Sequence, residues 1–125
     1  MSKYKAKKVN WNGEVFDSKK EWRRYLELQM LERAGKIRLL KRQVPFLLIP
    51  AQHETYERYS EKTGKRLKDG KRCLERELVY VADFTYFDAE TGEYIVEDTK
   101  GVRTEAYIVK RKLLLHTLGI KIKET

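Results

Sequence analysis

Residues 78–101 read LVYVADFTYFDAETGEYIVEDTKG, and this stretch decides the fold that we predict for the chain. Val, Tyr, Phe and Thr dominate residues 78–87, which is typical of a β-strand, and residues 93–100 have the pattern of a second strand. The polar segment 89–92 ends in glycine and predicts a turn between them. Pairing across this four-residue loop would place Asp83 directly opposite Asp98, with the two side chains roughly 5 Å apart on one face.

The residues around Asp98 alternate in a way that predicts their direction. In a strand, side chains two positions apart share a face, so Asp98 and Lys100 should point one way and Glu97 and Thr99 the other. Two carboxylates on a partly buried face repel each other unless one is protonated or a cation lies between them. Lys100 offers one cation, and a hard divalent ion such as Mg²⁺ offers another. A register slip of one residue would instead place Glu97 opposite Asp83.

A third acidic residue lies on a helix predicted for residues 18–34. Ser18 is a good N-cap and Gly35 a natural stop, and the apolar residues between them recur at helical spacing. Glu21 falls inside the apolar arc of this helix, so it should face the sheet. Two roles are open for it, because Ser18 and Glu21 also have the spacing of a capping box, and one carboxylate can serve both.

The remaining elements complete an α/β or α+β domain with a central mixed sheet flanked by helices. Asn12-Gly13 predicts a tight turn, and Gly119 a helix end. Residues 51–76 are polar and basic, and we expect a protruding hairpin or a mobile loop there. The other predicted elements are a hairpin at 7–16, a strand at 37–49, a helix from Thr104 to about residue 118, and a short strand at 120–123.

Composition narrows the function classes. The chain has 125 residues, which predicts a single domain, 1–125, with a basic insertion at about 51–76. Lys and Arg number 28 against 19 Asp and Glu, a net charge of +9 that favours a polyanionic partner, nucleic acid before an anionic membrane surface. The single cysteine, Cys73, suits a reducing compartment. The basic N-terminus (Lys3, Lys5, Lys7 and Lys8) lacks the apolar segment of a secretory signal, so we expect a cytoplasmic protein.

These motifs together resemble a known family. An Asp at a strand end, followed after a turn by D-x-K on the next strand, resembles the PD-(D/E)XK nuclease superfamily, with Asp83, Asp98 and Lys100 in the matching positions. The helix SKKEWRRYLEL (residues 18–28) and the stretch from Gly35 to Phe46 are also similar to family members. More closely, the chain resembles small phage-encoded Holliday junction resolvase-like endonucleases, over residues 11–119 apart from the insertion. Ala82 departs from the Pro that is common before the first motif Asp.

The resemblance implies a restriction-endonuclease-like core and a metal-dependent reaction. Glu21, Asp83 and Asp98 would hold one or two Mg²⁺ ions, with Mn²⁺ as a substitute, and the main-chain carbonyl of Thr99 would be a further ligand. A bound ion would activate water and offset charge on the phosphate. Lys100 would orient the attacking water or stabilise transition-state oxygens. We weight Asp98 over Glu97 as the motif acid, because only Asp98 shares a face with Lys100.

Several basic residues are candidates for DNA contact. They belong to the insertion, apart from one on the last helix: Lys62, Lys65, Arg66, Lys68, Lys71, Arg72 and Lys110. The alternative for the insertion is a solvated loop. Lys110, Arg111 and Lys112 diverge by about 100° each on a helix, so one of them at most, Lys110, is expected to point toward the site. Gln43 either approaches the site or is a plain strand-end polar residue.

We therefore expect an endonuclease that cuts branched DNA, such as Holliday junctions, in a phage-infected or prophage-bearing bacterial cell. Two symmetric cuts need two active sites, which predicts a homodimer. One alternative is a nicking or flap-type phage nuclease. Another, from a different class, is a non-catalytic basic DNA-binding module, which would bind in a strongly salt-dependent manner without a metal requirement.

Overall fold

The hairpin predicted from residues 78–101 is present in the structure, a computed structural model that describes residues 7–125. Strand β6 (Leu78–Asp88) pairs with β7 (Tyr94–Asp98) in antiparallel fashion, with Phe84 opposite Glu97 and Phe87 opposite Tyr94. This is the predicted register, and its next step places Asp83 beside Asp98. The turn is stabilised by Asp88, whose Oδ1 accepts the N–H groups of residues 90 and 91.

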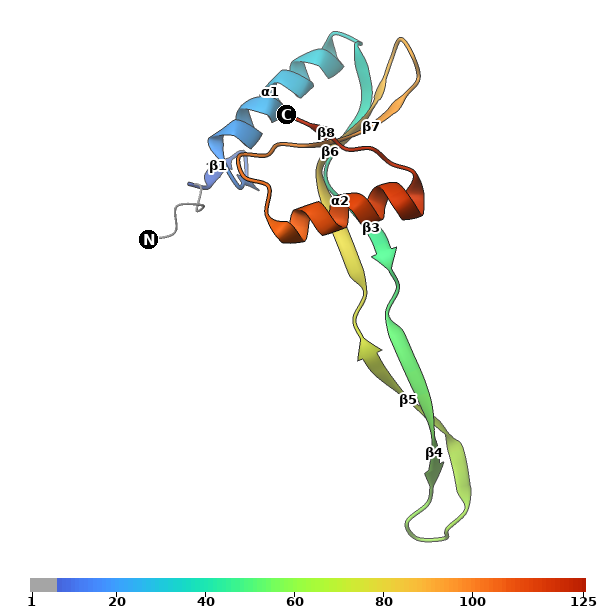
Figure 1. Cartoon of the computed structure of the whole chain (residues 1–125). Helices are drawn as coiled ribbons and strands as arrows, with labels where there is room; N and C mark the ends of the chain where they lie inside the picture. Colours follow the sequence, from blue (N-terminus) through green and yellow to red (C-terminus); the bar gives the residue numbers. More distant parts are fainter. Residues whose placement is uncertain (1–6) are drawn as a thin grey trace. The chain divides into compact units, whose positions relative to one another are not determined.

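Four strands form one sheet in the order β3-β6-β7-β8. Strand β3 (Ile37–Ile49) has the predicted bounds, whereas β8 (Lys123–Glu124) is shorter and begins later than the strand predicted at 120–123. Strand β8 runs parallel to β7, with Glu97 opposite Lys123, while β6 and β7 are antiparallel, so the sheet is mixed. The α+β class with a central mixed sheet is therefore confirmed (Figure 1).

Helix α1 (Lys19–Arg33) begins and ends where local chemistry predicts. The Ser18 hydroxyl accepts the Glu21 N–H, as an N-cap should. Gly35 takes the left-handed backbone that ends many helices (φ 75°), and the N–H groups of Gly35 and Lys36 return to the carbonyls of Glu32 and Leu31. This motif stops α1 and leads directly into β3.

The core lies where α1 covers the sheet. Leu28 of α1 is fully buried among Ile37 of β3 and Phe84 and Tyr86 of β6, and the Tyr25 ring stacks on Phe84 with 6.0 Å between centroids. Burial of such side chains contributes roughly 1.5–3 kcal/mol each. This packing fixes α1 on one side of the hairpin that bears Asp83 and Asp98.

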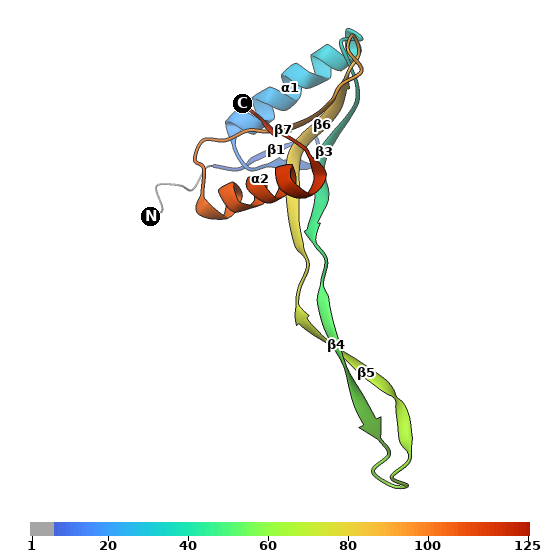
Figure 2. The same ribbon diagram turned by 45° about the vertical axis from the view of Figure 1, so that its right-hand side comes forward.

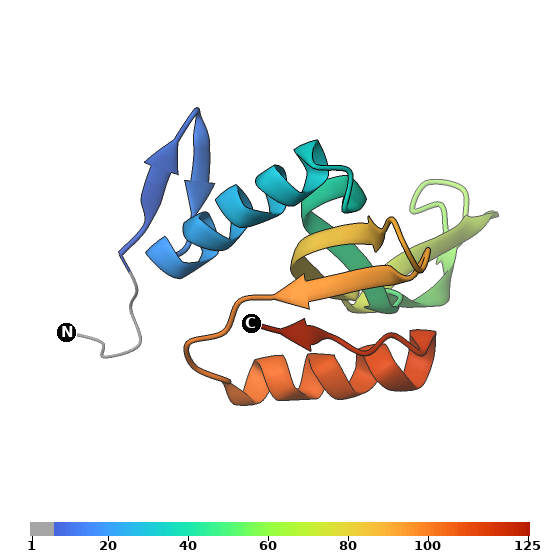
Figure 3. The same ribbon diagram turned by 90° about the horizontal axis from the view of Figure 1, so that it is seen from above.

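Helix α2 (Glu105–Leu118) is capped by Thr104 and closed by left-handed Gly119, both as predicted. Seen from above, the sheet lies between α1 and α2 (Figure 3). Among residues 7–125, no helix is long and apolar enough to cross a membrane. Lys3 and Lys5 of the basic N-terminus lie outside the described residues.

Two small hairpins complete the fold. The first joins β1 (Val9–Trp11) to β2 (Glu14–Phe16) through Asn12-Gly13, both with positive φ, as a tight two-residue turn requires. The second pairs β4 (Gln52–Tyr59) with β5 (Arg66–Glu75) as an antiparallel ribbon (Figure 2). Of the two alternatives predicted for residues 51–76, a hairpin or a mobile loop, the structure has the hairpin. By its internal contacts, the chain divides into two compact units, 47–79 and the remainder.

Candidate active site

Two carboxylates meet at the end of the β6–β7 hairpin. Asp83 Oδ2 accepts the main-chain N–H of Thr99 at 2.8 Å, which ties Asp83 to the motif on β7. Asp98 is 1% exposed; its Oδ2 accepts the Tyr80 hydroxyl at 2.5 Å, and its Oδ1 lies 2.9 Å from Lys100 Nζ. That ion pair does not have hydrogen-bond angles, so Asp98 Oδ1 has no hydrogen-bond partner among the described residues.

The proximity of these acids changes their electrostatics. Burial raises the pKa of Asp83 well above its usual range, and the charge of Asp98 raises it further, whereas the hydrogen bond from Thr99 opposes the shift. The charge of Glu21 also raises the pKa of Asp83, so the third predicted acid lies close enough to act on it. Burial, followed by the hydrogen bond to Asp98, raises the pKa of the Tyr80 phenol. The two carboxylates therefore repel each other unless a cation lies between them.

The pair opens into a cleft of about 330 Å³. Asp83, Asp98 and Lys100 all line it, as the shared face predicts. The Lys100 ammonium also lies 4.3 Å from the centre of the Tyr107 ring on α2, a cation–π contact that fixes its position. The cleft is completed by Asp17, Gln43, Tyr80, Val81, Thr104, Ala106, Tyr107 and Lys110.

Glu97, the neighbour of Asp98, has a wholly different environment. Its carboxylate accepts two hydrogen bonds from Arg24 of α1, at 2.7 and 2.9 Å, and one from the Tyr86 hydroxyl at 2.6 Å. Burial alone would raise the pKa of Glu97, but the Arg24 and Tyr86 contacts outweigh it and lower that pKa. Glu97 therefore faces α1, and both of its carboxylate oxygens already accept hydrogen bonds, whereas Asp98 lines the cleft.

Glu21 is buried and is not among the residues that line the cleft. Its Oε2 accepts the Asp17 N–H at 2.8 Å, and its Oε1 accepts the side-chain amide of Gln43 at 3.0 Å. The Asp17 contact stabilises the start of α1 much as a capping box would, one residue earlier than in the usual motif. Glu21 combines this structural role with proximity to Asp83.

Gln43 is a cleft residue, and this agrees with the less conventional of its two predicted roles. It lies inside β3 with a left-handed backbone (φ 50°), which is uncommon for a residue other than glycine and unfavourable by about 1–3 kcal/mol. Its side chain connects buried Glu21 to the cleft. Strain of this kind gathers at functional sites, where the surrounding structure maintains it.

The residues present fit a hard divalent cation in part. Asp83 and Asp98 supply clustered carboxylates, and the Oδ1 of Asp98 is buried without a hydrogen-bond partner. Oxygen ligands of this type are those that Mg²⁺ prefers. Within residues 7–125, no group of three or more His, Cys, Asp or Glu side chains comes together as a metal site, so the protein ligands here would be two carboxylates, with main-chain oxygen and water.

The predicted DNA-binding residues fall in two places. Lys110 of α2 lines the cleft, as expected. The others lie on the β4–β5 hairpin and are exposed: Lys62, Lys65, Arg66, Lys68, Lys71 and Arg72. Two of these are engaged locally, since Arg66 pairs with Asp69 at 2.9 Å and Arg72 pairs with Glu54 at 3.3 Å. The four lysines have no ion pair among the described residues.

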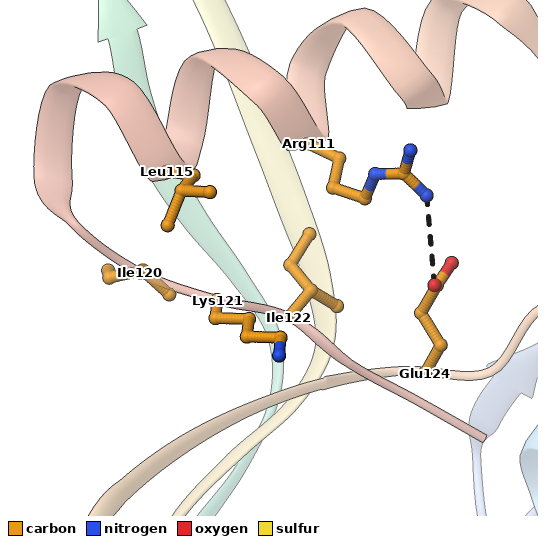
Figure 4. A pocket seen from close by; sticks show the side chains of 6 residues that line it. All are labelled: Arg111, Leu115, Ile120, Lys121, Ile122 and Glu124. Carbon is orange, nitrogen blue, oxygen red and sulfur yellow. Dashed lines mark ion pairs between the residues drawn. The ribbon is translucent and has the colours of Figure 1, made fainter.

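The three successive cations of α2 diverge, as their helical spacing predicts. Lys110 lines the cleft, whereas Arg111 lies 3.7 Å from Glu124 in a separate pocket of about 240 Å³. Figure 4 shows this second pocket, with Leu115, Ile120 and Ile122 as its apolar side. The Glu124 carboxylate in this pocket is already paired with Arg103 and Arg111, so the pocket offers fewer unpaired polar groups than the cleft.

Sequence reasoning missed two aromatic residues of the site, Tyr80 and Tyr107. Strict alternation along β6 places Tyr80 and Asp83 on opposite faces, so the strand pattern gave no reason to pair Tyr80 with Asp98. Tyr107 stands three residues after the cap Thr104 and three before Lys110, a spacing that puts all three on one side of α2. That spacing could have identified Tyr107 once Lys110 was assigned to the site.

Comparison with known proteins identifies the family. The searches of curated proteins and of solved structures returned no match. A family model described as "Protein of unknown function (DUF1064)" matches residues 1–122, nearly the whole chain. By this match, the chain belongs to the DUF1064 family.

Proposed function

We propose that this protein is a metal-dependent DNA endonuclease with its active site in the cleft of Asp83, Asp98 and Lys100. The observation that carries the proposal is a pair of carboxylates, Asp98 buried and Asp83 partly buried, with an adjacent lysine, in which one oxygen of Asp98 has no hydrogen-bond partner. A protein that only bound DNA would gain nothing from acids facing a polyanion. The element order and mixed sheet are compatible with the restriction-endonuclease-like core that the resemblance implies.

Each residue has a role that follows from its position. Asp83, Asp98 and the Thr99 carbonyl would hold the divalent ion, and Glu21 would support them through Gln43. When bound, the ion would lower the pKa of a water molecule and offset charge developing on the phosphate. Lys100, held by Asp98 and Tyr107, would donate to a phosphate oxygen or orient the attacking water. Lys110 adds a second positive charge to the cleft for the polyanionic substrate.

Branched DNA is the substrate class that we propose, with a homodimer as the acting form. A four-way junction is resolved by two symmetric cuts, and a two-fold dimer supplies two sites in matching orientation. This part of the proposal is carried by the resemblance to resolvase-like endonucleases and by the basic charge of the chain.

The test is cleavage of a labelled four-way junction beside duplex, nicked and flap DNA, with Mg²⁺ or EDTA. We expect paired cuts in the junction that require the metal and that Lys100→Ala abolishes. Cleavage of flap or nicked DNA in place of the junction would retain the nuclease and replace the substrate. Salt-dependent binding without cleavage under any divalent metal would contradict the enzyme and favour a binding module.

A further inference from the structure

A basic pocket lies next to the cleft, behind the same short segment of chain. It has a volume of about 300 Å³ and is lined by Lys20, Arg23, Arg24, Glu27, Thr99 and Thr125. Thr99 lines this pocket, while its neighbours Asp98 and Lys100 line the cleft. Lys20 Nζ donates to the main-chain oxygen of Lys100 at 3.0 Å, which joins α1 to the segment between the two sites.

The pocket has more donors than its own residues use. Arg24 uses each of its three nitrogens internally, because it donates twice to Glu97 and once to Glu27. Lys20 has one hydrogen bond for its three donor protons. Arg23 is exposed and has no ion pair or side-chain hydrogen bond among the described residues. The main-chain oxygen of Thr125 is occupied by the Lys100 N–H.

A buried hydroxyl adds an independent sign of a missing ligand. Thr99 Oγ1 is inaccessible to solvent and has no hydrogen-bond partner in the part of the chain that the structure describes. Buried polar atoms are nearly always paired, so an orphan of this kind calls for a partner. Thr99 lines the same pocket as Lys20 and Arg23, and the free donors of these two cations favour an anion with several acceptor oxygens.

We propose that the basic pocket binds a backbone phosphate of the DNA strand that passes through the cleft, with Lys20 and Arg23 as its donors. This inference rests on the proposed function, because the cleft defines where the strand passes. Lys20 and Arg23 are three residues apart on α1 and so share one side of the helix. A phosphate contact here carries no sequence information but fixes the register of the strand relative to Asp98 and Lys100.

The test measures binding of labelled junction and duplex DNA in EDTA, where no cleavage occurs, across a range of NaCl concentrations. We expect Lys20→Ala/Arg23→Ala to weaken binding at least roughly tenfold, as loss of charge-assisted hydrogen bonds implies. The slope of log affinity against log salt should fall in magnitude by about 0.9, the value for one phosphate. Arg23→Ala alone should show part of this loss without altering the fold, because Arg23 has no internal partner to lose.

The matched control is Lys19→Ala/Arg33→Ala, which removes the same charge from exposed positions of α1 outside the pocket. An equal loss of affinity in this control would overturn the inference, since binding would then follow net charge alone. An unchanged affinity in the pocket variants, with normal Mg²⁺-dependent cleavage by the wild type, would overturn the inference and leave the nuclease intact. A selective loss of binding in a protein that never cleaves would support the pocket and contradict the proposed enzyme. Absence of DNA binding by the wild type would overturn both.

Discussion

Glu97 and Asp98 are adjacent acids on one strand, and they lie in opposite environments. On the α1 side, Glu97 has Arg24, Tyr86 and Thr125 as hydrogen-bond partners and a lowered pKa. On the cleft side, Asp98 has an oxygen without a hydrogen-bond partner and lies close to Asp83, whose pKa is raised. The contacts of the first region stabilise the fold, whereas the repulsion between the carboxylates of the second opposes it. Acidic residues one position apart can therefore have a fully satisfied environment in one case and a repulsive one in the other.

The largest effect that we expect is on catalysis in the cleft. Lys100→Ala should reduce the rate of DNA cleavage by at least about 10²-fold, the usual loss for a group that stabilises a charged transition state. The substitution should also lower stability to some extent, because Asp98 is buried and loses its cation, although Asp98 would keep the hydrogen bond from Tyr80. Single-turnover cleavage and a thermal unfolding curve measure the two properties. If Lys100→Ala strongly lowered the unfolding temperature but kept the cleavage activity, Lys100 would serve the fold rather than catalysis, and this would contradict the assignment of the cleft as the active site.

The next effect concerns stability on the α1 side. Arg24→Ala leaves the Glu97 carboxylate buried without its cation, and breaking a buried pair in this way costs about 3–5 kcal/mol. Urea-induced unfolding provides the free energy difference. Arg23→Ala is the control, since an exposed arginine of the same helix should change the free energy of unfolding by less than about 0.5 kcal/mol. Equal effects of the two substitutions would show that the Glu97 network contributes little.

A smaller effect, of opposite sign, is expected from Asp83→Asn. The asparagine retains an oxygen for the Thr99 N–H and removes the repulsion with Asp98, so the metal-free protein should become more stable by about 1 kcal/mol. Divalent ions should raise the unfolding temperature of the wild type and have little effect on this variant. Destabilisation by Asp83→Asn in EDTA would contradict the claim that the carboxylates oppose folding.

The smallest effects on stability should come from the β4–β5 hairpin. Arg66 and Asp69 form an exposed pair, and Arg66→Ala should change the free energy of unfolding by no more than about 0.5 kcal/mol. If the hairpin binds DNA, replacing Lys65, Lys68 and Lys71 together by Ala should weaken affinity and reduce its salt dependence, by about 0.9 in slope for each phosphate that the variant no longer neutralises. Unchanged affinity across salt concentrations would identify the hairpin as a solvated element.

Much of this comparison could be predicted from the sequence, because its rules are local. The loop at residues 89–92 sets the register, and alternation along β7 separates Asp98 from Glu97. Other features depend on contacts between distant segments. Arg24 and Glu97 are 73 positions apart, and nothing in either neighbourhood links them. The left-handed backbone of Gln43 likewise could not be predicted from an extended apolar run. The same residue donates the hydrogen bond that connects Glu21 to the cleft.

The most direct test of the central claim is calorimetric titration of Mn²⁺ or Mg²⁺ into the wild type, Asp98→Asn and Glu97→Gln, with folding checked by circular dichroism. We predict that the wild type binds the metal, that Asp98→Asn loses this binding, and that folded Glu97→Gln retains it. Equal binding by wild type and Asp98→Asn, or no binding by the wild type, would contradict a metal site at Asp83 and Asp98.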